Sequence, residues 1–270
     1  MTDLELIVRG VRGSMSVSGE RYLRYGGNTT CFQLPLADRQ VIFDCGTGLR
    51  TVQHEIGSTA AQYVVFLTHY HWDHLQGIPV FAPYYLPGNS FTFYGPPSAT
   101  GTVAEVIDAV IRPPWFPVAF SDSIADVSCH DVPTEVSIDN VRVRSIELQH
   151  PDPVVGYRIE GPNRTVVLAT DHEAGNHEVD TRLIELAKGA DVLIHDSQYT
   201  PDDYVNERMG WGHSTWEHAV KAAQAAGVGE LLLTSHDPDH DDDAIDVIEA
   251  NARTQFPHTT AVFEGMRIPL

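Results

Sequence analysis

Three imidazoles and a carboxylate fall within six consecutive residues of this chain, at His69, His71, Asp73 and His74. Histidine and aspartate are the side chains that bind zinc and similar ions. They follow the apolar stretch 63–67, which predicts a buried strand. Side chains two apart in an extended chain point the same way, so His69 and His71 are placed to bind one ion together. Asp73 and His74 come after the strand ends and face another direction. The pattern therefore predicts two metal ions.

A two-metal centre needs more than four ligands, and the rest of the chain offers candidates. Three residues come directly after, or close behind, apolar strand-like segments: His150, Asp171 and His236. Open α/β sheets place their ligand-binding groups at the carboxyl ends of strands. A single histidine or aspartate at one strand end would be an ordinary turn residue. Several such strand ends in one short chain predict that these residues complete the metal centre.

The order of these residues resembles that of the metallo-β-lactamase-fold metallohydrolases, and within them the branch that holds tRNase Z and small phosphodiesterases. The family's HxHxDH motif is followed, as here, by one His, one Asp and a last His. Four further segments carry the resemblance: Asn28-Thr29-Thr30, Phe43-Asp44-Cys45-Gly46, Gly212-His213-Ser214-Thr215 and Leu233-Thr234-Ser235-His236. The similarity runs from near residue 8 to the C-terminus. The motif is highly specific for the fold and less specific for the substrate.

The resemblance implies two sets of metal ligands and a bridge between them. The first set is His69, His71 and His150. The second set is Asp73, His74 and His236. Asp171 would bridge the two ions together with a hydroxide. Zinc is the expected metal, and the same donors also accept manganese or iron. Two divalent cations lower the pKa of a shared water and stabilise charge on substrate oxygens, which suits attack on a phosphodiester or on a carbonyl.

His213 stands just before a predicted helix at 215–226. Ser214 and Glu217 have the spacing of a capping box, which predicts that the helix begins there. His213 is then expected at a helix N-terminus, where free N–H groups and the helix dipole favour an anion. A plain surface histidine beside a helix cap is the alternative.

Asp196 follows another apolar segment at 191–195. In the tRNase Z-like branch an acidic residue at this place, usually Glu in tRNase Z itself, orients the histidine that corresponds to His213. That histidine donates a proton or contacts the phosphate. The resemblance thus implies His213, Asp196 and Asp73 as the catalytic residues. A proton donor near a scissile phosphate contributes roughly a hundredfold in rate, which favours phosphodiester hydrolysis.

The charge of the chain narrows the substrate. Thirty-seven acidic and 17 basic residues give a net charge of −20, with no cluster of Lys and Arg. A protein that binds long RNA needs a basic surface. His150 and Asp171 are 21 positions apart, too few for the tRNA-binding arm that tRNase Z commonly has there. Asp237-Pro238-Asp239-His240 also differs from the Ser and Arg-Tyr that are typical of tRNase Z. We expect a small phosphodiester such as a cyclic nucleotide, and no long nucleic acid.

Three other functions remain open on the sequence. The same metals would serve a hydrolase of carbonyl esters, lactones or β-lactams, in which His213 would be dispensable. A tRNA 3′-processing endonuclease is disfavoured by the charge and by the short His150–Asp171 segment. A metal-binding regulatory module without turnover is disfavoured by the full set of ligands. The acidic composition is also compatible with a salt-rich habitat.

Strand and helix patterns predict one α/β (α+β) domain over residues 1–270, with strands first in each half and helices between them. This fits a four-layer αββα sandwich, the metallo-β-lactamase fold, with the metals along one edge. Helices are predicted near 101–111, 179–188, 215–226 and 242–254. Strands are predicted near 4–10, 41–44, 63–67, 91–94, 141–148, 155–160, 165–170, 191–194, 230–235 and 260–263.

The remaining composition bears on location and assembly. Cys31, Cys45 and Cys129 are far apart and cannot all pair, which predicts free thiols in a reducing cytoplasm. The sequence contains no run of about eighteen apolar residues, so no membrane span is predicted, and the first residues do not resemble a signal peptide. Members of the resembling branch often form homodimers, so a homodimer is expected here.

Overall fold

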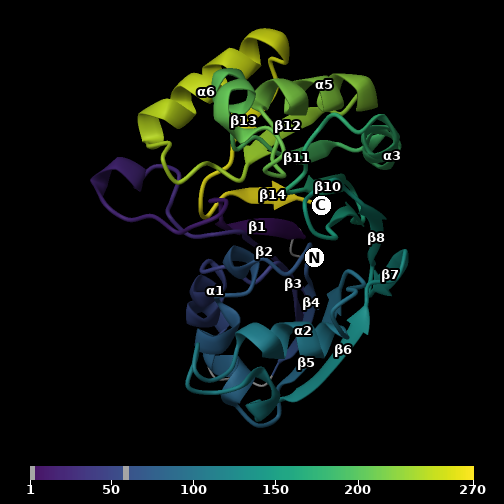
Figure 1. Cartoon of the computed structure of the whole chain (residues 1–270). Helices are drawn as coiled ribbons and strands as arrows, with labels where there is room; N and C mark the ends of the chain where they lie inside the picture. Colours follow the sequence, from purple (N-terminus) through teal and green to yellow (C-terminus); the bar gives the residue numbers. More distant parts are fainter. Residues whose placement is uncertain (1–3, 57–60) are drawn as a thin grey trace.

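The structure is a computed structural model that describes residues 4–56 and 61–270. Two seven-stranded sheets pack face to face, and helices cover the outer face of each (Figure 1). The predicted αββα sandwich is therefore confirmed.

The first sheet has the strand order β14-β1-β2-β3-β4-β5-β6. Its strands, in chain order, are β1 Glu5–Gly10, β2 Cys31–Pro35, β3 Arg39–Phe43, β4 Gln62–Phe66, β5 Ser90–Gly95, β6 Asp126–Asp131 and β14 Arg267–Pro269. Strands β3 to β6 are parallel, so their carboxyl ends share one edge of the sheet. Helices α1 (Leu49–Ile56) and α2 (Val103–Val110) belong to this half.

The second sheet has the strand order β13-β12-β11-β10-β9-β8-β7. Its strands are β7 Glu135–Ile138, β8 Val141–Glu147, β9 Val155–Glu160, β10 Thr165–Ala169, β11 Val192–Asp196, β12 Glu230–Thr234 and β13 Thr259–Ala261. Strands β10 to β13 are parallel. Helices α3 (His177–Ala187), α5 (Trp216–Ala226) and α6 (Asp242–Gln255) belong to this half. Short helical turns complete the chain: Glu20–Tyr22, Trp72–His74, Ile78–Val80, Ala82–Tyr85, Phe120–Asp122, Pro201–Asp203 and Tyr204–Arg208.

Apolar side chains explain the layers. Phe43, Phe66 and Tyr157 lie with others between the two sheets and hold them together. The outer face of the second sheet packs against the apolar stripe of α5, which is buried throughout: Trp216, Ala219, Val220, Ala223 and Ala226. The aliphatic and aromatic residues of each layer are thus removed from water, which is the main force that stabilises the fold.

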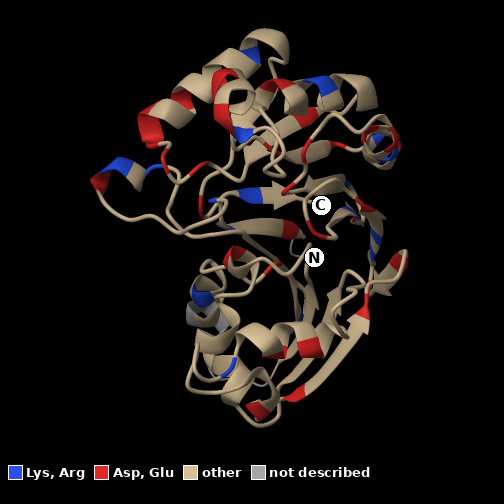
Figure 2. Cartoon of the chain, viewed as in Figure 1, with Lys and Arg blue, Asp and Glu red and all other residues tan. Residues whose placement is uncertain are grey.

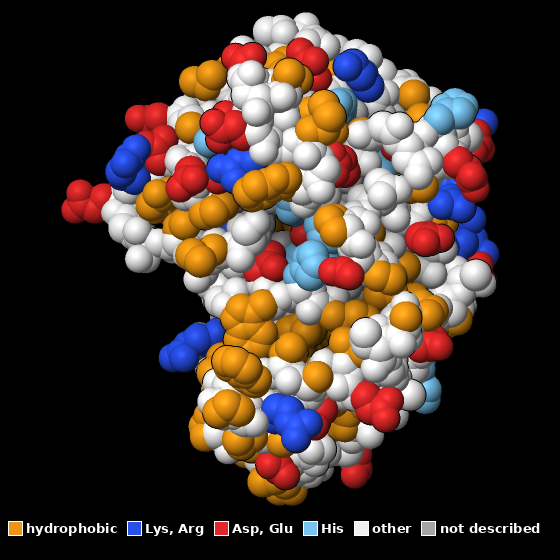
Figure 3. Space-filling model, in the orientation of Figure 1, with side chains coloured by type: hydrophobic (Ala, Val, Ile, Leu, Met, Phe, Trp, Pro, Cys, Tyr) orange, Lys and Arg blue, Asp and Glu red, His pale blue; other side chains and the backbone are white. Residues whose placement is uncertain are grey.

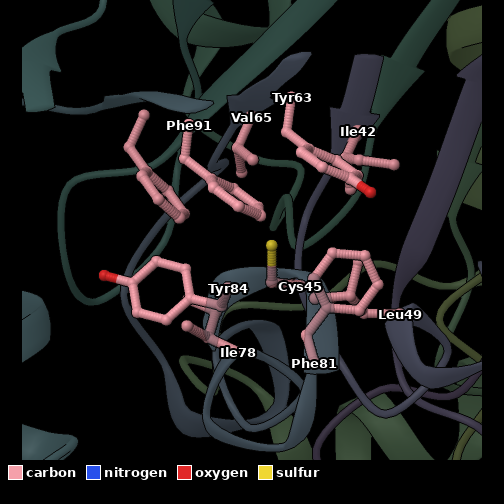
Figure 4. Close-up of a pocket in the computed structure, with 10 residues that line it drawn as sticks. Ile42, Cys45, Leu49, Tyr63, Val65, Ile78, Phe81, Tyr84 and Phe91 are labelled. Atoms are coloured by element: carbon pink, nitrogen blue, oxygen red, sulfur yellow. The ribbon is translucent and has the colours of Figure 1, made fainter. Parts of the chain in front are cut away.

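A third apolar cluster fills the outer side of the first sheet and contains a small void (Figure 4). The void has a volume of about 10 Å³ and is lined by apolar and aromatic side chains, among them Cys45, Tyr63 and Phe91. The rings of Tyr63 and Phe91 stack at 4.4 Å. A void of this size and polarity stays dry, so it is a packing feature and no binding site.

Several elements were not predicted from the sequence: β2, β6, β7, β14 and α1. Strand β6 is mostly exposed and lies at the sheet edge, and its only apolar side chains, Val127 and Cys129, give too short an alternation to predict a strand. Strand β14 has only three residues. Within the described residues no helix is long and apolar enough to cross a membrane. Figure 2 shows Lys and Arg interspersed with Asp and Glu, and Arg142, Arg144 and Arg158 meet at the carboxylate of Glu160.

Candidate metal centre

The carboxyl ends of β4, β8 and β10 bring most of the predicted ligands to one edge of the sandwich. The face in Figure 3 is hollowed near its middle, where histidine and acidic side chains lie among hydrophobic ones. His69, His71 and His150 form one group in which one ring nitrogen from each residue lies within 4.8 Å of the other two. His150 Nε2 is 3.1 Å from His71 Nδ1. These three imidazoles, predicted as one set, therefore converge.

His69, His74 and Asp171 form a second group within the same limit. His74 Nε2 lies 3.3 Å from Asp171 Oδ2 and 3.3 Å from Asp73 Oδ2. His69 Nε2 lies 3.6 Å from Asp171 Oδ2. Asp171 thus stands between the two groups, where the resemblance placed a bridging ligand.

The donor atoms fit divalent cations. The Nε2 atoms of His69 and His74 are buried and have no hydrogen-bond partner. A buried polar atom without a partner is costly, and a bound cation would supply the partner. Burial, with neighbouring histidines adding to it, lowers the pKa of His69 well below its usual value, so its ring is neutral and able to bind a metal.

Each of the four histidines has its other ring nitrogen bound to an oxygen atom. The pairs are His69 Nδ1 with Thr68 Oγ1 at 3.0 Å, His74 Nδ1 with Asp44 Oδ2 at 2.9 Å, His150 Nδ1 with the Gly212 carbonyl at 2.8 Å, and His71 Nε2 with Asp152 Oδ2 at 3.0 Å. Such bonds fix which nitrogen carries the proton and aim the other at the metal. A side chain at Gly212 would collide with His150, since a Cβ there would lie 2.2 Å from Nδ1.

Two of these partners were missed in the sequence. Asp44 is fully buried and also accepts hydrogen bonds from the Thr68 amide and hydroxyl. It lies in a segment that resembles the family, and its position just after a strand was the available signal. Asp152 lies in a loop with no pattern, so nothing in the sequence indicated it.

Asp73 is held from two sides. Its Oδ2 accepts a hydrogen bond from the Ser14 amide at 2.9 Å. Its carbonyl accepts one from Thr29 Oγ1 at 2.7 Å, which explains the Asn-Thr turn near the N-terminus. The backbone approaches closely at Gly46, where a Cβ would lie 2.5 Å from the Asp73 carbonyl oxygen.

His213 lies beside both metal-binding groups. Its Nδ1 is 2.6 Å from Asp196 Oδ2, and its ring centre is 5.3 Å from that of His150. Asp171, Asp196 and His213 have donor atoms within 4.8 Å of one another. Burial lowers the pKa of His213, but the carboxylates of Asp196 and Asp171 outweigh it and raise the pKa to about 9. The raised pKa favours the imidazolium form of His213, the charged form that can donate a proton.

The helix after His213 begins one residue later than the sequence suggested. The N-cap is Thr215, paired with His218, in place of Ser214 with Glu217. Ser214 instead donates to the His172 carbonyl at 2.6 Å, while its amide donates to Asp196 Oδ1 at 3.1 Å. Because the Ser214 hydroxyl donates to the carbonyl of the distant residue His172, it does not cap the helix, and the sequence gives no sign of this contact.

The structure differs from expectation at His236. Its Nε2 lies 2.9 Å from the Val262 carbonyl, and its ring packs edge-on against Tyr25 at 5.6 Å. Among the described residues it belongs to none of the three groups that could hold a metal. The preceding residue, Ser235, adopts a φ of +59° and lies 3.5 Å from Asp171 Oδ1 through its hydroxyl. Ser235, one position earlier, thus takes the place at the strand end that was expected for His236.

Comparisons with known proteins agree with the geometry. The beta-lactamase superfamily domain family matches residues 39–236. The chain is 30% identical to Ribonuclease Z of Lacticaseibacillus casei (strain BL23), and the alignment covers 90% of each protein. The crystal structure of the metallo-beta-lactamase fold protein YhfI from Bacillus subtilis has a TM-score of 0.73 at 18% identity, covering 98% of this chain and 99% of that one. A diphosphatase from the PhnP family has a TM-score of 0.72 at 18% identity, covering 99% and 98%.

Proposed function

The chain belongs to the beta-lactamase superfamily, in the branch near tRNase Z, and is a metal-dependent hydrolase; from this premise we propose that it hydrolyses a small phosphodiester such as a cyclic nucleotide. His69, His71, His150, Asp171, Asp73 and His74 would hold the divalent ions. When bound, such ions activate water and neutralise charge on the substrate's oxygens.

The observation that carries the proposal is the pair His213–Asp196. Asp196 accepts from Nδ1 of His213, which leaves Nε2 as the proton donor. With its pKa raised to about 9, His213 is protonated at neutral pH. The leaving group of a phosphodiester is an alkoxide that needs a proton, and a positioned acid supplies it. Asp196 keeps the imidazolium oriented because its other oxygen is held by the amides of Ser214 and Gln198.

The names of similar proteins support chemistry at phosphorus. Those reported above include a ribonuclease and a diphosphatase. The charge of −20, with acidic side chains interspersed among Lys and Arg, argues for a small substrate in place of a long RNA. Residues 151–170 also agree, because they form little more than the antiparallel pair β9–β10 and leave no length for an extended arm.

The proposal is tested with metal-loaded protein and a panel of substrates. Zinc- and manganese-loaded samples are assayed on bis(p-nitrophenyl) phosphate, 2′,3′- and 3′,5′-cyclic nucleotides, p-nitrophenyl acetate, a lactone and a β-lactam. We expect turnover of the phosphodiesters, with a cyclic nucleotide among the substrates cleaved. Cleavage of the carbonyl compounds alone would replace the proposal with the carbonyl hydrolase. Efficient cleavage of a precursor tRNA, with none of the small phosphodiesters cleaved, would replace it with tRNA processing.

A further inference from the structure

At the end of β12, the position next to the metal centre and the imidazole that could bind a metal belong to two neighbouring residues, Ser235 and His236. Ser235 directs its hydroxyl to Asp171, 3.5 Å from Oδ1, and so lies at the metal centre. His236 carries an imidazole but directs it to the Val262 carbonyl. Ser235 therefore lies at the metal centre but offers only a hydroxyl, which is a weak metal ligand. The imidazole of His236, a stronger ligand, lies outside the centre.

The backbone holds this arrangement in place. The His236 amide donates to the Val11 carbonyl at 2.9 Å, and the His236 carbonyl accepts from the Gly13 amide at 3.1 Å. His236 is 3% exposed, and its ring also contacts Tyr25. Turning the His236 ring toward Asp171 would break its hydrogen bond to the Val262 carbonyl. It would also require the backbone at His236 to turn over, although both its amide and its carbonyl are hydrogen-bonded.

The two halves of the centre consequently differ in their donors. The first has three imidazoles, from His69, His71 and His150, with Asp171 beside them. Three protein nitrogens and an open position are what a catalytic zinc ion needs. The second half has one imidazole, His74, and the carboxylates of Asp73 and Asp171. A set dominated by oxygen binds zinc less tightly and suits harder ions such as Mn²⁺ or Mg²⁺.

We infer that the metal centre is asymmetric: one ion is bound tightly at His69, His71 and His150, and a second is bound weakly at Asp73 and His74 because Ser235 supplies no imidazole. The second ion exchanges with the medium, and its identity follows the supply of metal. Only this second site would respond to changes in free Mn²⁺ or Zn²⁺. The inference concerns metal binding alone and holds for any substrate.

The test measures binding and requires no activity. Metal-free protein is titrated with Zn²⁺ in a calorimeter, and the metal retained after gel filtration is determined by elemental analysis. Wild-type protein should retain one equivalent, with a second that binds at least about tenfold more weakly. Ser235→His should retain two. A histidine tolerates the φ of +59° better than most residues do, because histidine is enriched among residues with positive φ.

Two further variants keep the result decisive. Ser235→Asp supplies a carboxylate on a smaller side chain than that of Ser235→His, so it tests the same position if the imidazole does not fit. It should also strengthen zinc binding at the second site. His236→Ala is the matched control, and its zinc stoichiometry should equal that of wild type. Circular dichroism and thermal melts establish that each variant is folded. Two zinc ions of equal affinity in wild type, or the loss of one ion in His236→Ala, would overturn the inference.

Discussion

His213 Nδ1 and Asp196 Oδ2 lie 2.6 Å apart, with the carboxylate fully buried. Asp196 also accepts bonds from two backbone amides, so it is a fixed negative charge that cannot turn away. A charged hydrogen bond in such surroundings is stronger than a neutral one. The pair orients the imidazolium and keeps it protonated, and both effects should be visible in separate measurements.

Removing the Asp196 charge should shift the pH dependence of turnover. Burial lowers the pKa of His213, and the carboxylates raise it above 6.5 to about 9. The protonated form is the active one, so kcat should fall as the pH rises through about 9. In Asp196→Asn the negative charge that raises the pKa of His213 is lost, so the decrease in kcat should occur at lower pH. A decrease at the same pH in Asp196→Asn and wild type would show that His213 is not the titrating acid.

Asp152 should tighten metal binding although it touches no ion. It accepts from His71 Nε2 at 3.0 Å and so aims Nδ1 at the first metal group. Loss of such a partner weakens metal affinity by roughly 10–100-fold. Because Asp152 is exposed, we expect Asp152→Ala to lie near the lower figure, measured by competition with a zinc chelator. Asp126→Ala, an exposed acid on β6, is the control and should leave the affinity unchanged.

Glu160 should make stability depend on acid pH. Partial burial raises its pKa, but hydrogen bonds from Arg158, Arg142 and Arg144 outweigh this and lower it from 4.5 to about 2. A carboxylate whose pKa is lower in the folded state than in the unfolded state stabilises the protein at every pH above the unfolded-state pKa. For Glu160 this stabilisation is lost as the pH falls from 4.5 through about 2.

The corresponding measurement compares Glu160→Gln with wild type. The variant should be less stable by about 2 kcal/mol at pH 7, and the difference should begin to shrink below pH 4.5. Urea unfolding at several pH values gives both quantities. Glu178→Gln, at an exposed residue that pairs with Arg182 along α3, should change stability little. Equal effects at pH 7 and pH 3 would contradict the role of the Glu160 charge.

The sequence predicted those parts of the site that a strand or a helix positions directly. His69 and His71 alternate along an extended segment, and His150 and Asp171 come at or just beyond strand ends, so their convergence follows from sheet geometry. The helix predicted near 215–226 is present as α5, Trp216–Ala226. These features depend on local periodicity, which a single sequence contains.

Contacts between distant segments were not predictable. Asp44 reaches His74 across 30 positions, and Asp152 reaches His71 across 81. At the end of β12 a positive φ at Ser235 decides which of two adjacent side chains faces Asp171, and nothing in the residue types reveals that angle. The prediction at His236 was therefore displaced by one residue.

The central claim is tested most directly by hydrolysis of bis(p-nitrophenyl) phosphate by wild type and His213→Ala at equal metal content. Equal content matters because His213 lies next to Asp171, and a loss of metal would imitate a loss of acid. The account predicts that wild type turns over and that kcat in the variant falls at least about tenfold. Equal turnover in the two proteins, or no turnover with either zinc or manganese while an ester or lactone is cleaved, would contradict it.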